Sequence, residues 1–262
     1  LSRLGEGVGE DPTVALWSFG IGLAAMALFV WRQLILQREN RALLDLRTFR
    51  TRTFAVAVAM FAAAMMSLFG AIILLPLFTQ GVLGLTVLQS GLMLLPGGLT
   101  SGLLAPWVGR AYDRIGPRPL LIPGAVLIAT AMLLMALSAS VEAHWWQILA
   151  AHVTMSVGLA LTFTPLFSAS LGSLPQRLYS HGSATVSTLQ QVAAAAGTAL
   201  FISVMALVTG WGLADGLSEA AAQADGIRAA FAVAAVISAS GIVLASFIQR
   251  PDSTEAPAPA GH

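Results

Sequence analysis

The sequence predicts an all-α membrane protein with seven transmembrane helices. Of its 262 residues, 57% are hydrophobic and only 10% are charged, and the mean hydropathy is +0.82. A soluble chain of this length needs many more charged residues to cover its surface. The hydrophobic residues also form seven separate stretches without Asp, Glu, Lys or Arg. Each stretch is close to the roughly 20 residues that a helix needs to cross a bilayer.

In chain order, the predicted spans are residues 13–31, 54–78, 86–108, 120–137, 145–167, 184–208 and 229–247. Helix is favoured over strand because a helix satisfies its own backbone groups in lipid. Each stretch is also about twice as long as the roughly ten residues of a barrel strand. Prolines at positions 76, 96, 106, 123 and 165 lie near span ends or at expected kinks, where neighbouring groups or water take up the freed carbonyls.

Arginine is distributed unevenly between the two sides of this topology. All 13 basic residues are arginine, and 11 of them fall on the side that holds the first, third and fifth connections and the tail. The positive-inside bias makes this side cytoplasmic, so the chain is expected to begin outside the cell membrane and end inside it. The net charge of +1 does not indicate a nucleic-acid partner, because the charge is sorted by side and not gathered in a patch.

The segments between the spans complete the predicted organisation. In the linker, Leu43, Leu44, Leu46 and Phe49 stand among charges, which suits either a short helix on the membrane surface or a solvated linker. Residue 1 is Leu and no signal peptide precedes the first span, so we expect the C-terminal part of a longer protein. The expected parts are an extracytoplasmic segment (1–12), an extra helix (13–31), a basic cytoplasmic linker (32–53), a six-helix unit (54–248) and a disordered cytoplasmic tail (249–262).

The most specific motif is the charged segment GRAYDRIGPR at residues 109–118. Its three arginines and one aspartate cannot lie in hydrocarbon, so the segment predicts a cytoplasmic loop between two spans. The pattern Gly-x-x-x-Asp-Arg-x-Gly-x-Arg resembles the signature loop of the major facilitator superfamily, which joins the second and third helices of each six-helix half. The matching residues are Gly109, Asp113, Arg114, Gly116 and Arg118.

The resemblance extends over nearly the whole chain. A six-helix unit after a basic linker and one extra span is similar to the 14-helix drug:proton antiporters of the EmrB/QacA type. The phrase LLDLRTFRTRTFA (43–55) looks like the entry to the ninth helix of that branch, and residues 89–118 look like its tenth helix and following loop. The resemblance implies a six-helix half of a major facilitator fold, with one N-terminal half and one extra helix upstream. It also implies proton-coupled export of drugs or other amphipathic small molecules by alternating access.

The same resemblance implies a gating role for the charged segment. Asp113 would accept hydrogen bonds at a helix N-terminus of the other half, where the helix dipole favours a carboxylate. Arg110 and Arg114 would pair with acidic groups and lock the cytoplasmic side. Gly109 and Gly116 would allow close helix approach and the tight turn. The alternative is that the arginines only fix the topology.

Four polar side chains inside the spans are candidates for the transport cavity. His152 lies about 10 Å into the fifth span at 1.5 Å per residue, and Ser156 follows one turn later. An ionisable group at this depth is a candidate proton relay, whereas the plainer alternative is a neutral histidine bonded to a neighbouring helix. Gln190 and Gln191 in the sixth span are either substrate contacts or interhelical hydrogen-bonding groups.

Apolar residues of the second span give a further candidate set. Phe61, Met65 and Phe69 recur every four residues, which indicates either helix packing or an adaptable wall for apolar cations. Gly98 and Gly102 in the third span are interpreted as a small-residue pair for close packing.

What the sequence lacks narrows the function further. No predicted span holds a carboxylate, so the coupling acids are expected in the other half unless His152 serves. There is no phosphate-binding loop of the G-x-x-x-x-G-K type and no Cys, and we expect no enzyme activity, no cofactor and no metal. The expected partners are membrane lipid, an amphipathic substrate, protons and the N-terminal half. Two alternatives remain open, namely a seven-span receptor and a permease subunit of an ATP-driven transporter.

Overall fold

The computed structural model describes residues 12–38 and 44–248, and they contain helices and no strand. Residues 1–11 of the expected extracytoplasmic segment (1–12) and the expected tail (249–262) lie outside these ranges, as does Leu43 of the linker. The seven long helices are α2 (Pro12–Arg38), α3 (Arg52–Leu77), α4 (Val87–Ile115), α5 (Arg118–Ser138), α6 (Trp145–Gly172), α7 (Tyr179–Ala214) and α8 (Glu219–Ala245). The shorter elements are η1 (Leu46–Arg50), η3 (Gln176–Leu178) and a π-helical turn, η2 (Phe78–Val82), that continues α3.

All seven long helices are long and apolar enough to cross a membrane, which confirms the predicted fold class. Several extend beyond the apolar stretches that predicted them. The longest, α7, has 36 residues and is therefore about 54 Å long, well above the roughly 30 Å of a hydrocarbon core. The helices therefore continue outside the bilayer, where polar residues are no obstacle to helical structure.

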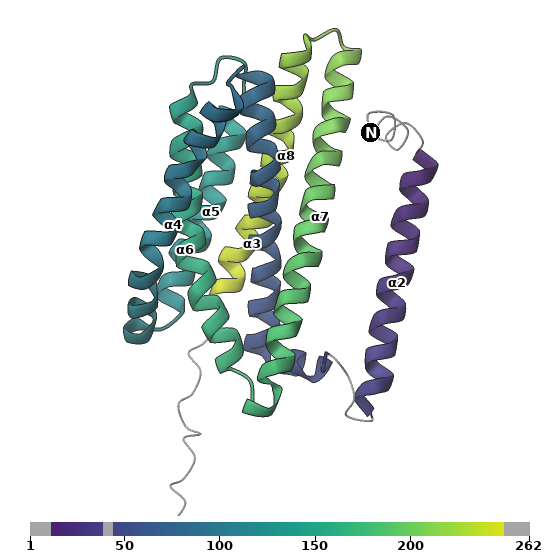
Figure 1. Ribbon diagram of the computed structural model, residues 1–262, viewed down its shortest axis with the longest axis vertical. Helices are drawn as coiled ribbons and strands as arrows, with labels where there is room; N and C mark the ends of the chain where they lie inside the picture. The colour runs from purple at the N-terminus through teal and green to yellow at the C-terminus, as the bar shows by residue number, and fades with distance from the viewer. Residues whose placement is uncertain (1–11, 39–43, 249–262) are drawn as a thin grey trace, which may run out of the picture.

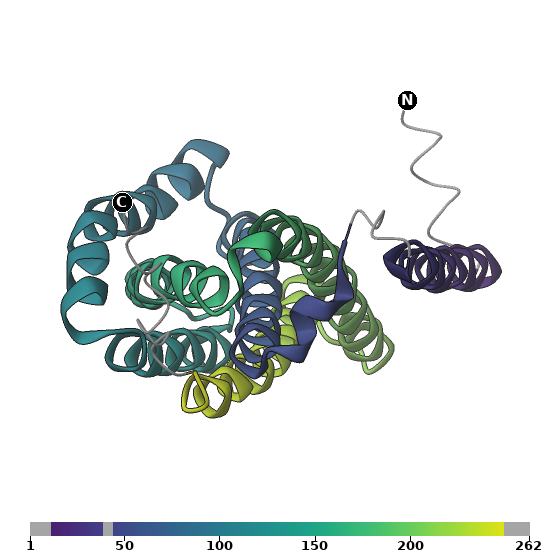
Figure 2. The same cartoon turned by 90° about the horizontal axis from the view of Figure 1, so that it is seen from below.

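The helix α2 stands apart from the other six, as both views show (Figures 1 and 2). Large apolar side chains such as Trp17, Ile21 and Trp31 are exposed along it. Its C-terminal end is held by two glutamines. The amide oxygen of Gln33 accepts a hydrogen bond from the backbone of Leu44 at 3.1 Å, and that of Gln37 accepts one from Leu46 at 3.1 Å.

The remaining six helices form one bundle (Figure 2). Within it α4 packs on α6, α6 on α5, and α5 on α8, while α3 contacts α6, α7 and α8. Glycines permit the closest approaches. A Cβ atom on Gly158 of α6 would lie 2.8 Å from the carbonyl oxygen of Gly124 on α5, and one on Gly197 of α7 would lie 2.7 Å from the Cα of Met66 on α3.

The bundle has two buried apolar clusters, one toward each membrane surface. One surrounds Phe54, Phe61 and Leu166, at the end where η1, the α4–α5 turn and η3 lie. This end, which carries most of the arginines of the described residues, is called the Arg-rich end below. The other cluster surrounds Phe78, Met132 and Phe231 toward the opposite end. Burial therefore extends through the whole thickness of the bundle.

The structure corrects two expectations about the connections. The charged segment 109–118 is not a loop, because α4 continues to Ile115 and only Gly116 and Pro117 separate it from α5. The helix dipole favours the arginines of this last turn, and water beyond the bilayer solvates them. The described part of the linker is not fully solvated. Residues 32–38 belong to α2, and residues 46–50 form the short helix η1, so a short helix, one of the two alternatives, is present. Thr48 of η1 is buried, and so is Leu44 just before it.

Candidate functional site

The turn of the charged segment depends on one glycine. Gly116 has a φ of 80°, a backbone conformation that strains other residues, and its N–H donates to the carbonyl of Tyr112 at 2.8 Å. This confirms the tight turn expected at Gly116. Gly109 behaves differently, because a Cβ placed there would meet nothing within 4 Å. The close helix approach expected at Gly109 does not occur with any described part of this chain.

The three arginines of the segment have distinct surroundings. The guanidinium of Arg110 lies 4.5 Å from the ring centroid of Trp107, and its Nε donates to the Pro106 carbonyl at 3.4 Å. Arg114 is exposed one turn further along α4. Arg118 donates from Nη2 to the carbonyl of Ser246, the residue that ends α8, and so stabilises that helix terminus. Arg118 is thus a packing residue within this bundle, whereas Arg110 and Arg114 point outward.

Asp113 is exposed in the last turn of α4. A carboxylate at a helix C-terminus is disfavoured by the dipole of its own helix. Its position beside Arg114 at the Arg-rich end is therefore not explained by the stability of α4 alone.

His152 and Ser156 lie between α6 and α4. The Nε2 atom of His152 lies 3.2 Å from the carbonyl oxygen of Leu94, and since a carbonyl only accepts, Nε2 is the donor. Ser156 donates to the backbone of His152 at 2.9 Å, and its own carbonyl accepts from Ser101 of α4 at 2.9 Å. His152 and Ser156 therefore join two helices in this arrangement. The Nδ1 atom of His152 is buried, with no hydrogen-bond partner in the described part of the chain.

Gly97 makes this contact possible, which the sequence alone did not indicate. A Cβ at Gly97 would lie 2.5 Å from both His152 Nε2 and Ser156 Oγ, whereas one at Gly98 or Gly102 would meet nothing within 4 Å. The interpretation of Gly98 and Gly102 as the close-packing pair is therefore wrong for the described bundle. Adjacent residues on a helix are about 100° apart, so the packing face is the one that carries Gly97.

The two adjacent glycines provide a matched test of this contact. We expect Gly97→Ala to lower the free energy of unfolding by about 1–3 kcal/mol, because the new methyl group displaces His152 or Ser156. Gly98→Ala should be neutral or slightly stabilising, since alanine is the better helix former. Thermal unfolding of the purified variants in one detergent measures the difference. Equal melting temperatures for the two variants would contradict the described α4–α6 contact.

The candidate set Phe61, Met65 and Phe69 on α3 does not share one environment in the structure. Ser67 bonds Ser238 of α8 at 2.7 Å, and Met65 and Phe69 lie two residues to either side of Ser67, so they face away from α8. Both are partly exposed, and Ile72 one turn on is 50% exposed. Phe61 is only 2% exposed and stacks on Phe163 of α6, with ring centroids 6.0 Å apart. Phe61 is therefore buried by the rings of Phe163 and Phe167 on α6 that lie at its level along α3.

The two glutamines of α7 also diverge. Gln190 is partly buried and lies two turns before Gly197, on the side of α7 that faces α3. Gln191 is exposed on a different side of the helix. Adjacent residues on a helix are about 100° apart, so the two glutamines do not face the same neighbour. Of the predicted cavity residues, Met65 and Phe69 share the partly exposed face of α3, and Gln190 lies on the side of α7 that faces α3. Phe61, His152 and Ser156 instead contact neighbouring helices, and Gln191 is exposed elsewhere.

Comparison with known proteins decides the family. The family model described as Major Facilitator Superfamily matches residues 11–198, which is more than half of the chain. The chain belongs to the major facilitator superfamily. It is therefore a multi-pass membrane protein of a family of transporters, not of enzymes, and the receptor and ATP-driven permease alternatives are not supported.

Individual relatives of the superfamily agree with this assignment. The lincomycin resistance protein LmrB of Bacillus subtilis is 34% identical over 261 residues, which cover 95% of this chain and 53% of the relative. The protein of the same name from Listeria monocytogenes is 33% identical over 255 residues, with the same two shares. A multidrug resistance protein B homolog of Mycobacterium tuberculosis is 33% identical over 180 residues, covering 68% of this chain and 33% of the relative. The chain thus spans about half the length of the two lincomycin resistance proteins.

Proposed function

We propose that this chain is the C-terminal half of a drug efflux transporter of the 14-helix type. The observation that carries the proposal is the match of 95% of the chain to lincomycin resistance proteins of which it covers only 53%. The remaining length of those relatives is enough for a second six-helix half. The helix α2 would then be one of two additional helices between the halves, which agrees with its position apart from the bundle in Figure 1.

Alternating access would use the face of α3 that points away from α8. On this face Met65, Phe69 and Ile72 form an apolar, partly exposed wall, and the half-exposed ring of Phe167 packs edge-on against nearby Phe61. Adaptable Met and aromatic side chains suit amphipathic substrates of varied shape. Transporters built from repeats hold their substrate near the bilayer midplane, between the repeats. A second half placed against this face would complete such a site.

Proton coupling is part of the proposal, although the described helices hold few side chains that can bind and release a proton. The carboxylates of the described helices are Asp113 near the end of α4 and Glu219 and Asp225 in the first turns of α8. His152 is the titratable side chain deep within a span, and its unpartnered Nδ1 supports a relay role. Its hydrogen bond to Leu94 supports the alternative, in which His152 is a structural link between α4 and α6. If His152 has only this structural role, the acids that couple transport to protons would lie in the other half.

The orientation is proposed from the arginine distribution. The ends of α2, α4 and α6 and the starts of α3, α5 and α7 all lie at the Arg-rich end (Figure 1). The positive-inside bias places this end in the cytoplasm of a cell membrane, so the segment after α8 would be cytoplasmic. Asp113, Arg110 and Arg114 would then act at the cytoplasmic gate, where the Asp113 carboxylate would accept hydrogen bonds from a helix N-terminus of the other half.

Labelling of introduced cysteines tests the proposed pathway, and these 262 residues contain no cysteine of their own that would react. In the assembled transporter, Phe69→Cys should react with a water-soluble maleimide because it would line an aqueous cavity. Val236→Cys on α8 should not react, although Val236 is 74% exposed, because it lies on the α5–α8 side that would face lipid. Substrate should slow labelling at position 69 only.

The opposite pattern would remove the open face of α3 from the transport pathway. Labelling at position 236 with none at position 69 would show that the α5–α8 side meets water and that the α3 face does not. A second variant at Met65 guards against loss of folding at position 69, because both residues lie on the same face.

A further inference from the structure

A basic pocket lies at the Arg-rich end, outside the proposed transport pathway. It has a volume of about 420 Å³, within the range of small-molecule sites. Three parts of the chain that are distant in sequence contribute to it: the end of α2, the helix η1, and the connection from α6 to α7. The residues that matter for its chemistry are Gln37, Asp45, Arg47, Arg50, Arg177 and His181.

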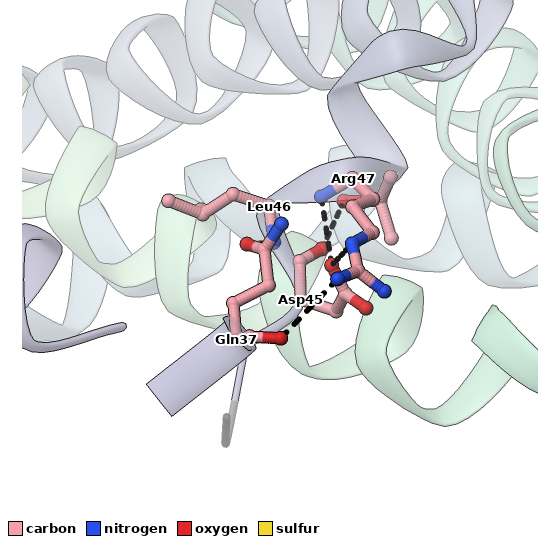
Figure 3. A network of polar contacts seen from close by, with 5 residues as sticks. Gln37, Asp45, Leu46 and Arg47 are labelled. Carbon is pink, nitrogen blue, oxygen red and sulfur yellow. Dashed lines mark hydrogen bonds and ion pairs between the residues drawn. The ribbon is translucent and has the colours of Figure 1, made fainter. Parts of the chain in front are cut away.

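One wall of the pocket is held in place by a polar network (Figure 3). The amide oxygen of Gln37 accepts from the backbone of Leu46 at 3.1 Å, and its carbonyl accepts from Arg47 Nη2 at 3.2 Å. Asp45 accepts from the backbone N–H of Arg47 at 2.9 Å and begins η1. These bonds tie η1 to the end of α2, so the wall that bears Arg47 and Arg50 is formed without a ligand.

The charges of the described residues that line the pocket are unbalanced. These residues include Arg47, Arg50 and Arg177 but a single carboxylate, Asp45. The Asp45 carboxylate lies 4.0 Å from Arg47 Nε, so its negative charge is balanced mainly by the positive charge of Arg47. In the described part of the chain no carboxylate pairs with Arg50 or Arg177, which approach the pocket from η1 and from η3. Guanidinium groups contributed by two separate elements favour a doubly coordinated anion such as a phosphate.

The pocket also lies beside the ends of three helices that are long and apolar enough to span a membrane. The candidate span of α2 ends at Gln37, that of α3 begins at Arg52, and the helical segment that leads into α7 begins at Gln176. In a bilayer these helix ends would lie toward the membrane surface, where the phosphates of phospholipids are. Basic pockets between transmembrane helices suit anionic lipid headgroups.

We propose that this pocket binds a phosphate group between Arg50 and Arg177, and that the phosphate belongs to an anionic phospholipid. Bound there, the phosphate would link η1, which leads into α3, to η3, which leads into α7. The lipid would thus link the N-terminal ends of α3 and α7. The proposal concerns binding alone and does not depend on the transport role.

Lipid titration of the purified protein tests the proposal, with native mass spectrometry as the readout. We expect phosphatidylglycerol to bind at least tenfold more tightly than phosphatidylcholine. The double variant Arg50→Gln/Arg177→Gln should weaken phosphatidylglycerol binding roughly 30-fold, since each arginine near an anionic headgroup adds to the attraction. The variant Arg32→Gln/Arg52→Gln is the control, because it removes two charges near the same end from residues that do not line the pocket. Its affinity should change less than about threefold.

Two further arms make the test decisive. Asp45→Asn removes the carboxylate of the pocket while keeping a residue that begins helices well, so it should tighten phosphatidylglycerol binding. Inorganic phosphate at millimolar concentration distinguishes the sources, because competition by it would assign the site to a soluble anion that carries the same group. Equal affinities of wild type and Arg50→Gln/Arg177→Gln, or an equal loss in the control variant, would overturn the proposal. If the double variant fails to fold, unchanged binding by Asp45→Asn would overturn it instead.

Discussion

Asp113→Asn is expected to reduce substrate export by the assembled transporter at least tenfold, with normal insertion into the membrane. The asparagine keeps the shape of the side chain but loses the charge. A hydrogen bond to a charged group contributes about 1.5–3 kcal/mol, so its loss at the proposed gate corresponds to tenfold or more in the gating equilibrium. Initial rates of export from vesicles, at matched protein content, measure the effect.

A charge-matched control separates gating from general electrostatics. Asp225→Asn removes a carboxylate at the opposite end of the bundle, where Asp225 pairs with Arg228 at 3.2 Å in the first turns of α8. It should leave export within about twofold of wild type, because exposed ion pairs contribute little. Export at the wild-type rate by the Asp113→Asn variant would contradict a gating role for Asp113.

Gly197→Ala should be the most destabilising single-methyl substitution in α7. Its Cβ would lie 2.7 Å from the Cα of Met66 and 3.0 Å from the Met66 carbonyl oxygen. Backbone atoms cannot rotate away as a side chain can, so α3 and α7 must separate along their contact. We expect a loss of about 1–3 kcal/mol in the free energy of unfolding, or a failure to fold. Thermal unfolding followed by circular dichroism measures the change.

Gly210 offers the matched control on the same helix. A Cβ at Gly210 would meet nothing within 4 Å, so Gly210→Ala should be neutral or stabilise by up to about 1 kcal/mol. Both substitutions add one methyl group to α7 and differ only in what that group meets. Similar melting temperatures for the two variants would contradict the described packing of α7 on α3.

The sequence was sufficient for the fold because the membrane imposes one strong rule. A span must be apolar over about 20 residues and must satisfy its own backbone, so the seven apolar stretches determined the seven helices. Helix ends were less predictable, as α4 shows. Water solvates Arg110, Asp113 and Arg114 as well on a helix as in a loop, so charge alone did not reveal that α4 continues to Ile115.

The site was harder to predict because it depends on which side of each helix meets a neighbour. Gly97 and Gly98 are identical in sequence terms, yet only Gly97 faces His152. Phe61 and Phe69 share a four-residue pattern, yet Phe61 stacks on α6 while Phe69 stays on the open face. Rotation about a helix axis is set by tertiary packing, which no local pattern contains. Polar residues between apolar spans likewise did not reveal that Arg50 and Arg177 line one pocket.

Substrate flux in reconstituted vesicles tests the central claim, that this six-helix bundle transports only together with a second half. Vesicles that contain the 262-residue chain alone should show no flux above protein-free vesicles when a pH gradient is imposed. Vesicles that contain the chain joined to an N-terminal six-helix half should show flux that collapses when the gradient is dissipated. Gradient-dependent flux from the chain alone, at a rate comparable to that of the joined protein, would contradict the claim.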